Sequence, residues 1–406
     1  MSTGQAGFPK RGKALLVTTA YYPPQVGGIS HFLAKVVSTL GPEAICCLTG
    51  VAADKSGPTD STIYRFPSLL GPSKIGRAAA WASALTMIMV RDRPRVVLLG
   101  SAIDSSCGLW LHRRLKLPFI LFVYGNELLS AVSGEYEQAL RAFKVANRVV
   151  ACSNYTASLA EKAGVDPRRI QVNYPGCDTE LFRPLAVRQD LRERLLRSSD
   201  QRKQVILTVG NLVARKGHDM VIRALALLKN RVPAFVYLIV GDGPYRGVLE
   251  SLVSEVGVAD SVVFTGKMPD KDIPDLHALS DVFVMASRER LDGDDVEGFG
   301  MVFLEANACG KPVVGGRAGG IPEAVVEGVT GLLVNPHSPE QIAEALANLL
   351  VDRDLARRLG EQGRSRVVRE FQWTQVGERI LNLINTVQAE GTTSGRSGAA
   401  AVTGST

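Results

Sequence analysis

The sequence predicts an α/β protein made of two doubly wound parallel sheets, and three observations carry this prediction. Short apolar runs alternate with helical patterns along the whole chain. These runs are apolar at nearly every position, as in strands of a parallel sheet that is covered on both faces. The chain has 406 residues, enough for two or three domains, and the alternation pauses only once, near residues 175–200.

The first unit should contain five strands separated by helices. The predicted strands are the apolar runs at 14–19, 44–48, 96–99, 119–124 and 149–151. The predicted helices, read from apolar residues at helical spacing, are 28–40, 76–92, 105–116 and 135–147.

The second unit repeats this architecture without a detectable sequence repeat. Its predicted strands are 205–210, 235–240, 262–265, 281–285, 312–315 and 331–334. Its predicted helices are 217–230, 245–256, 271–279, 299–309, 320–327, 339–351 and 355–369.

Domain boundaries follow from composition. Residues 1–12 and 391–406 carry few bulky apolar side chains and are expected to be disordered. We predict a first domain over 13–185, a linker over 186–200 and a second domain over 201–372. The amphipathic segment 373–390 is one further helix.

The composition excludes several classes of protein. With 46% hydrophobic and 21% charged residues, the chain is neither mostly disordered nor fibrous. No apolar run approaches the roughly 18 residues of a transmembrane helix, and the N-terminus lacks a signal-peptide core. The six cysteines form no CxxC pair, so we expect reduced cysteines and a cytoplasmic protein.

The net charge of +7 is concentrated in the first unit. Residues 1–190 carry a net charge of +9, whereas residues 191–406 carry −2. An anionic partner or a membrane surface would explain this asymmetry, and a solvated charged face would explain it equally well. The segment 109–117 (LWLHRRLKL) has the same two interpretations: a helix at an anionic lipid surface, or a core-facing stripe with a basic outer side. No nucleic-acid-binding motif is present.

The first strand ends in TTAYYPPQVGGIS, which leads into a helix. Gly27 and Gly28 at the start of that helix leave backbone N–H groups open to an anion. The pattern is not GxGxxG, and no acidic residue closes the second strand, so a dinucleotide site is disfavoured. A plain glycine turn is the alternative.

Two adjacent cations follow the first strand of the second unit, in GNLVARKG. Arg215 and Lys216 lie beyond the carboxyl end of a parallel strand, which is where ligands bind to open α/β sheets. A planar guanidinium beside a point charge suits a diphosphate. A solvated pair of loop residues is the alternative.

The segment VEGFGMVFLEANACG is the most informative part of the sequence. Glu297 precedes a predicted helix and Glu305 lies eight residues later, on that helix. N–H groups at the helix start favour a phosphate, and a carboxylate on each side could hold the hydroxyls of two sugars. Two exposed glutamates on an amphipathic helix would give the same spacing.

Taken together, these motifs resemble the retaining glycosyltransferases of family 4, which have the GT-B fold. The resemblance covers about residues 13–388. Within the family, the sequence is most similar to the bacterial phosphatidylinositol-mannoside mannosyltransferases. The resemblance implies two Rossmann-like domains facing each other across a cleft, with the C-terminal helix returning to the first domain. It rests on YYPPQVGGIS, GNLVARKGHD, LIVGDGPYR, VVFTGKMP, ALSDVFVMAS, VEGFGMVFLEANACGKPVVG, GGIPEAV and GLLV.

The resemblance implies roles for four charged residues. Glu297 matches the glutamate that grips the donor sugar, and Glu305 the one that binds the ribose hydroxyls. Arg215 and Lys216 match the pair that neutralises the diphosphate leaving group.

Further donor contacts are implied in the same way. Gly28 would approach the phosphate from the other domain, and the turn at Lys267 and Met268 would meet the base. The backbone expected to touch sugar and phosphate belongs to Phe299, Gly300, Met301 and Val302.

One position departs from the family pattern. Many members have a histidine in a His-Gly-x-Glu stretch, where this chain has Tyr124-Gly125-Asn126-Glu127. A tyrosine hydroxyl can still donate or accept a hydrogen bond there. We expect Tyr124 to line the site together with the catalytic Glu297, although a simple strand-end aromatic is the alternative.

The sequence therefore predicts a retaining hexosyltransferase that uses GDP-mannose or a UDP-sugar and a lipid-linked or glycan acceptor. No cofactor is implied, and we expect no metal to be required, because Arg215 and Lys216 take the place of a divalent ion at the diphosphate. The DxD triplet at Asp292 and Asp294 recurs elsewhere in the chain and is uninformative. The protein would be cytoplasmic and peripheral on the inner face of the plasma membrane. A catalytically impaired nucleotide-sugar-binding subunit is the alternative function.

Overall fold

A computed structural model describes residues 12–25, 27–52, 62–132, 137–232, 234–289 and 295–399, the last nine of these by their backbone only. The chain divides into two compact units. Unit 1 comprises residues up to Cys152, Ala157–Asn173 and the segment from Trp373 onward. Unit 2 comprises Ser153–Thr156 and Tyr174–Gln372.

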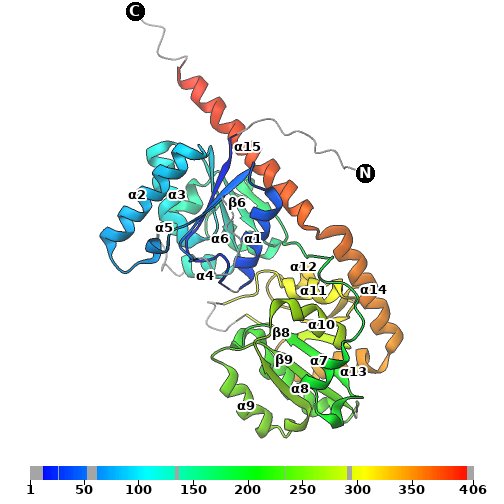
Figure 1. The fold of residues 1–406 in the computed structure, drawn as a ribbon. Coiled ribbons are helices and arrows are strands. Elements are labelled where there is room, and N and C mark those ends of the chain that lie inside the picture. Colours follow the sequence, from blue (N-terminus) through cyan, green and yellow to red (C-terminus); the bar gives the residue numbers. More distant parts are fainter. Residues whose placement is uncertain are drawn as a thin grey trace, which may run out of the picture. The chain divides into compact units, whose positions relative to one another are not determined.

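Unit 1 is built on a seven-stranded parallel sheet (Figure 1). In sheet order the strands are β3 (Ile63–Arg65), β2 (Ile45–Thr49), β1 (Ala14–Thr18), β4 (Val96–Leu99), β5 (Phe119–Val123), β6 (Arg148–Ala151) and β7 (Ile170–Val172). The helices are α1 (Gly28–Leu40), α2 (Lys74–Arg91), α3 (Ser105–Leu115), α4 (Asn126–Val132), α5 (Glu137–Val145), most of α6 (Asn154–Lys162) and α15 (Trp373–Ala399).

The C-terminal helix α15 belongs to unit 1, as the sequence predicts. It packs beside α1 on one face of the sheet (Figure 1). Phe32 of α1 lies at the centre of this contact, with its ring centroid 5.9 Å from that of Trp373 and 5.7 Å from that of Phe122 on β5. Burial of the apolar stripe of α15, including Val376 and Ile380, ties this distant segment to the first sheet.

Unit 2 is built on a six-stranded parallel sheet. In sheet order the strands are β10 (Val262–Gly266), β9 (Phe235–Val240), β8 (Gln204–Val209), β11 (Val282–Met285), β12 (Val313–Gly316) and β13 (Gly331–Val334). The helices are α7 (Gln189–Leu195), α8 (His218–Leu228), α9 (Arg246–Glu255), α10 (Ile273–Leu279), α11 (Met301–Ala308), α12 (Ile321–Ala324), α13 (Pro339–Val351) and α14 (Arg353–Glu370).

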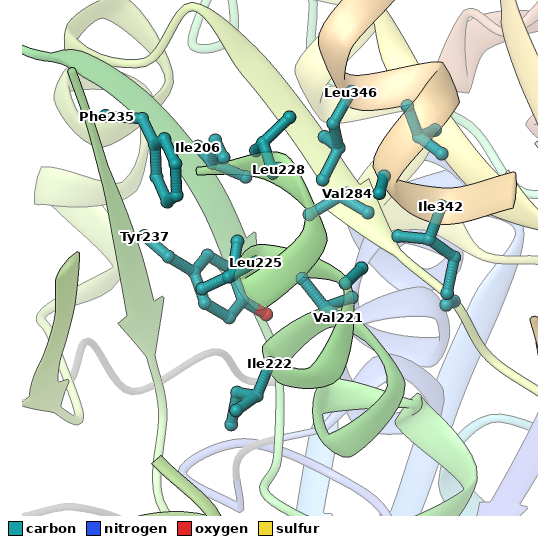
Figure 2. Packing of buried hydrophobic residues seen from close by; sticks show 14 of the residues in the cluster. Ile206, Val221, Ile222, Leu225, Leu228, Phe235, Tyr237, Val284, Ile342 and Leu346 are labelled. Atoms are coloured by element: carbon teal, nitrogen blue, oxygen red, sulfur yellow. The ribbon is translucent and has the colours of Figure 1, made fainter. Parts of the chain in front are cut away.

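The core of unit 2 lies where helices α8 and α13 pack against the sheet (Figure 2). Tyr237 on β9 is fully buried there, and its hydroxyl lies 2.8 Å from Thr208 Oγ1, so its polar end is satisfied. The other labelled members are apolar side chains from β8, β9, β11 and the two helices: Ile206, Val221, Ile222, Leu225, Leu228, Phe235, Val284, Ile342 and Leu346. This core fixes α8, and with it the loop that precedes α8.

Two predicted boundaries differ from the structure. The segment 186–200, predicted to be a linker, contains α7 and belongs to unit 2. Leu191 and Leu196 are buried there, and Arg192 donates to the carbonyls of Gln201 and Lys203. The helix α15 continues to Ala399, inside the segment predicted to be disordered, since extending a formed helix costs less than nucleating one. Residues 400–406 and residues 1–11 of the predicted tails lie outside the described residues.

Each sheet has one point where the chain reverses its direction of strand addition. In unit 1 this point lies between β1 and β4, and in unit 2 it lies between β8 and β11. Loops that leave two adjacent parallel strands in opposite directions open a crevice at the carboxyl edge, and ligands of doubly wound folds bind there. A ligand site is therefore expected at the loops that follow these four strands.

Candidate active site

A compact cluster of charges lies at the reversal point of unit 2. Arg215 and Lys216 form a 3₁₀ turn after β8, and Glu297 lies in the loop between β11 and α11. Glu297 Oε2 accepts hydrogen bonds from Arg215 Nη1 at 2.7 Å and from Lys216 Nζ at 2.5 Å. Arg215 Nε makes a second ion pair, at 2.8 Å, with Asp295 Oδ1.

This cluster is largely shielded from water. The side chains of Arg215, Lys216 and Glu297 are 21%, 12% and 15% exposed. Burial opposes ionisation of Glu297, but the cations of Lys216 and Arg215 outweigh it and lower the pKa of this carboxyl to about 2. Glu297 is therefore ionised at neutral pH, and two cations converge on one carboxylate oxygen.

Glycines on both sides give the cluster its geometry. Gly217 has φ +72°, and a Cβ there would lie 1.9 Å from the carbonyl oxygen of Ala286. The turn can therefore approach the end of β11 only without a side chain. On the other side, Gly320 N donates to Glu297 O at 2.9 Å, and a Cβ on Gly319 would lie 2.3 Å from the same oxygen. The GGIPEAV motif thus seats the loop that carries Glu297.

Helix α11 begins directly after this loop. Its N-cap is Gly300, with φ +94°, and a Cβ there would lie 2.7 Å from the ring of Phe303. Met301 and Val302, the first two helical residues, are half-buried. Their backbone N–H groups have no intrahelical acceptor at this position, which makes the helix start able to bind an anion. Phe299, in the preceding loop, is buried.

Glu305 lies on the second turn of α11 and is half-buried. Among the described residues, its carboxyl group has no hydrogen-bond or ion-pair partner. Burial, with a smaller contribution from Asp270, raises the pKa of Glu305 to about 7. A half-buried carboxyl group without a protein partner is well suited to accept hydrogen bonds from ligand hydroxyls.

Lys267 and Met268 follow β10, two strands away from the cluster. Lys267 is exposed and Met268 is half-buried, after a turn at Gly266 with φ +72°. Within the described ranges, no hydrogen bond or ion pair joins them to the charged cluster. Their contact with a base stays a prediction.

Tyr124 and Gly28, the other two predicted residues, lie in unit 1. Gly28 is the first residue of α1. Tyr124 is half-buried at the end of β5; its hydroxyl donates to Gly100 O at 3.0 Å, and its ring meets Phe32 edge-on. Its backbone N–H donates to the Glu127 carboxylate. The aromatic side chain is thus held by its own unit, and its role toward a donor stays a prediction.

Sequence reasoning missed a buried carboxylate at the reversal point of unit 1. Asp104, which follows β4, accepts hydrogen bonds from Thr19 N at 3.1 Å and from Thr19 Oγ1 at 2.6 Å. Burial raises the pKa of Asp104 to about 6. Asp104 therefore anchors the loop that leads from β1 to Gly28, and its position just after an apolar strand was the signal that could have found it.

Within the described residues, no group of three His, Cys, Asp or Glu side chains has the arrangement of a metal site. Asp292 and Asp294 of the DxD triplet lie outside those residues. Metal independence accordingly remains a proposal and is taken up below.

Two protein-family profiles match the chain. Residues 33–181 match the profile described as Glycosyltransferase Family 4, and residues 191–366 match Glycosyl transferases group 1. The first match falls mostly on unit 1, and the second lies within unit 2 and contains the whole charged cluster.

Several curated relatives span nearly the full chain. A GDP-mannose-dependent alpha-(1-6)-phosphatidylinositol monomannoside mannosyltransferase of Mycolicibacterium smegmatis is 41% identical, over 91% of this chain and 98% of the relative. The enzyme of the same name from Mycobacterium tuberculosis is 32% identical, over 91% and 97%. These relatives are enzymes, so the alternative of a catalytically impaired binding subunit is not favoured.

Solved structures agree on the fold. Sucrose-phosphate synthase from Thermosynechococcus elongatus superposes with a TM-score of 0.79 at 21% identity, covering 94% of this chain and 100% of that one. HepE from Anabaena, solved in complex with UDP-glucose, superposes with a TM-score of 0.74 at 22% identity, covering 93% and 100%. The resemblance read from the motifs is confirmed: the chain belongs to the family 4 glycosyltransferases of the GT-B fold.

Proposed function

We propose that this glycosyltransferase moves mannose from GDP-mannose to a hydroxyl group of a phosphatidylinositol mannoside. The names of the mannosyltransferases that match over nine-tenths of the chain support this donor and this lipid-linked acceptor. The observation that carries the proposal is the Arg215–Lys216–Glu297 cluster at the reversal point of unit 2, where two cations face a single carboxylate oxygen.

The cluster provides a means of stabilising the leaving group. A bound diphosphate competes with Glu297 for the two cations, with Arg215 acting as a planar fork and Lys216 as a point charge. Negative charge grows on the diphosphate as the glycosidic bond breaks, so these cations act most strongly in the transition state. Glu297, released from them, is free to accept hydrogen bonds from hydroxyls of the sugar.

The remaining roles follow from the same arrangement. The N–H groups that open α11 bind phosphate oxygens, and Glu305 accepts hydrogen bonds from the ribose. The acceptor hydroxyl attacks the face from which the diphosphate departs, and the leaving phosphate takes its proton. The product keeps the anomeric configuration of the donor without a protein nucleophile.

The test is transfer of labelled mannose from GDP-mannose to phosphatidylinositol monomannoside, with UDP-glucose as the competing donor. We expect mannose transfer that a chelator leaves unchanged, because Arg215 and Lys216 supply the positive charge. Loss of activity with the chelator, restored by Mg²⁺ or Mn²⁺, would contradict metal independence. Transfer from UDP-glucose but not from GDP-mannose would contradict the proposed donor.

Nucleotide binding should depend on pH through Glu305. Because only the ionised carboxylate accepts two ribose hydrogen bonds, GDP should bind more tightly as pH rises through the pKa of about 7. Between pH 6 and pH 8 the ionised fraction, and with it the affinity, should rise about tenfold. Calorimetric titration with GDP measures this change.

The Glu305→Gln variant is the control for the pH experiment. GDP has a phosphate group that also titrates near pH 6, and this variant reports that part of the pH dependence alone. Its affinity should be lower than that of the wild type at pH 8, and it should lack the additional tenfold rise. An identical pH profile in both proteins would contradict the ribose role of Glu305.

A membrane-bound acceptor requires access to a lipid surface, and we propose that α3 and α5 of unit 1 provide it. Among the described residues, no helix combines the length and hydropathy needed to cross a bilayer. Within 109–117, Leu111 is buried in the core, whereas Trp110 is half-exposed, and this exposed aromatic side chain supports the proposed lipid contact. Trp110, Arg113, Arg114 and Arg141 line a groove of about 380 Å³ between the two helices. Peripheral attachment to the inner face of the plasma membrane is part of this proposal.

The groove predicts selective binding to anionic vesicles. The protein should co-sediment with vesicles that contain phosphatidylinositol and not with purely zwitterionic ones. Binding should fall as salt rises, because charge attraction is screened over about 8 Å at physiological ionic strength. Replacement of Arg113, Arg114 and Lys116 by Gln should reduce binding at least about tenfold, since each basic residue near such a surface contributes about 1 kcal/mol.

A matched variant removes three exposed positive charges from unit 2 instead. The triple change at Arg194, Arg202 and Arg358 to Gln lowers the net charge equally and should leave vesicle binding unchanged. Equal losses in both variants would indicate a nonspecific charge effect. Sedimentation of the wild type with both vesicle types, or with neither, would contradict the proposed surface.

A further inference from the structure

Another ion pair, separate from the charged cluster, lies at the same reversal point of unit 2. Arg288 Nη2 donates to Asp219 Oδ2 at 2.9 Å, and the two side chains are only 13% and 10% exposed. Arg288 follows β11, whereas Asp219 lies in the first turn of α8. The pair therefore connects the helix that follows β8 to the segment that follows β11, and β8 and β11 are the strands between which the chain reverses direction.

A backbone hydrogen bond also joins the segment after β11 directly to the turn that carries Arg215 and Lys216. Arg288 N donates to Arg215 O at 2.8 Å, so the residue that forms the ion pair also holds the turn of the diphosphate cations. Gly217, between that turn and Asp219, is in contact with the carbonyl of Ala286. The turn is thus attached to the end of β11 at three successive points: at Arg215, at Gly217 and at Asp219.

The chemistry of the pair makes it sensitive to substitution. Asp219 Oδ1 and Arg288 Nη1 are buried, and within the described part of the chain neither has a hydrogen-bond partner. The ion pair is therefore the main compensation for burying both charges, and removing one partner leaves the other uncompensated.

We infer that the Arg288–Asp219 ion pair positions Arg215 and Lys216 for the diphosphate, and that Arg288 is a positioning residue. This inference rests on the proposed function, because it assigns the two cations to a nucleoside diphosphate. Loss of the pair releases the turn from β11, so the cations no longer converge on one point.

Calorimetry with GDP tests the inference. Arg288→Gln and Asp219→Asn should each weaken GDP binding about tenfold, and Arg288→Lys, which keeps the charge, should recover part of the loss. The double variant should bind GDP no more weakly than either single one. In an Arg215→Ala background, Arg288→Gln should cause a smaller loss of GDP affinity than in the wild type, because one of the two cations that it positions is already absent.

Lys203→Gln is the matched control. Lys203 pairs with the buried Asp200 at 2.7 Å, in the same unit but before β8, and should affect the melting temperature without affecting GDP affinity. Wild-type affinity in Arg288→Gln, or an equal loss of affinity in Lys203→Gln, would overturn the inference. So would fully additive losses for Arg288→Gln and Arg215→Ala.

Hydrogen exchange separates this inference from the proposed function, since it needs no nucleotide. In the unliganded protein, Arg288→Gln should accelerate exchange of the Lys216 and Gly217 amides at least about tenfold more than Lys203→Gln does. Equal exchange in both variants would overturn the positioning role. If the wild type binds no GDP and Arg288→Gln still shows the selective acceleration, the proposed function alone is contradicted.

Discussion

Replacing Arg215 and Lys216 together by alanine is expected to abolish measurable mannose transfer and to weaken GDP binding by about 10²- to 10⁴-fold. Each residue supplies a charge-assisted hydrogen bond to the diphosphate worth about 1.5–3 kcal/mol, and the two losses combine. The structure adds a second consequence, because the ionised Glu297 loses both of its cationic partners. Calorimetry with GDP and turnover with GDP-mannose measure the two effects.

A control for this double variant exists on the adjoining helix. Arg223 and Lys229 are exposed residues on and just after α8, and their replacement by alanine removes the same two residue types without touching the cluster. This control should bind GDP like the wild type. Equal affinities for GDP in all three proteins would contradict the assignment of Arg215 and Lys216 to the diphosphate.

Glu297→Gln is expected to lower kcat by about 10²-fold or more, the scale of losing one well-placed electrostatic group. Its affinity for GDP should be unchanged or tighter. The carboxylate occupies the two cations in the unliganded protein, and a neutral amide competes with the diphosphate less effectively. Steady-state kinetics and calorimetry on the same preparation separate the two quantities.

Asp295→Asn distinguishes the two ways in which Glu297 could act. Asp295 also pairs with Arg215, at 2.8 Å, but is not assigned to the sugar. If Glu297 served only to hold Arg215, the two variants should lose activity to a similar extent. We expect Asp295→Asn to lose far less, and a similar 10²-fold loss would contradict the role of Glu297 at the sugar.

Much of the fold was predictable because parallel strands are buried on both faces. Nine of the eleven strands that sequence reasoning found lie inside their sheets, such as β5 and β9, and the other two, β10 and β13, are edge strands of more than three residues. The two that it missed, β3 and β7, are three-residue edge strands whose side chains are mostly half-buried. A short edge strand has no continuous apolar run, so its sequence gives no signal.

The prediction of a linker over residues 186–200 was wrong for a related reason. Helix α7 has a single buried residue, Leu191, and a charged surface. Its attachment to unit 2 depends on Arg192 reaching two backbone carbonyls, which no local pattern reveals.

The candidate site was predictable in its members but not in its connections. Motifs identified Arg215, Lys216 and Glu297, and assigned the cations to the diphosphate and the glutamate to the sugar. Their joint ion pair spans some eighty positions of sequence and becomes visible only in three dimensions. The pair of Asp219 and Arg288 carries no motif at all, because its function depends on the reversal point between β8 and β11.

The anomeric configuration of the product tests the central claim most directly. Purified protein is incubated with GDP-mannose and phosphatidylinositol monomannoside, and the linkage of the new mannose is determined by NMR. Departure of a diphosphate stabilised by Arg215 and Lys216, followed by attack on the same face, predicts an α-linked mannose, as in the donor. A β-linked product, or GDP release without transfer to the lipid, would contradict the account.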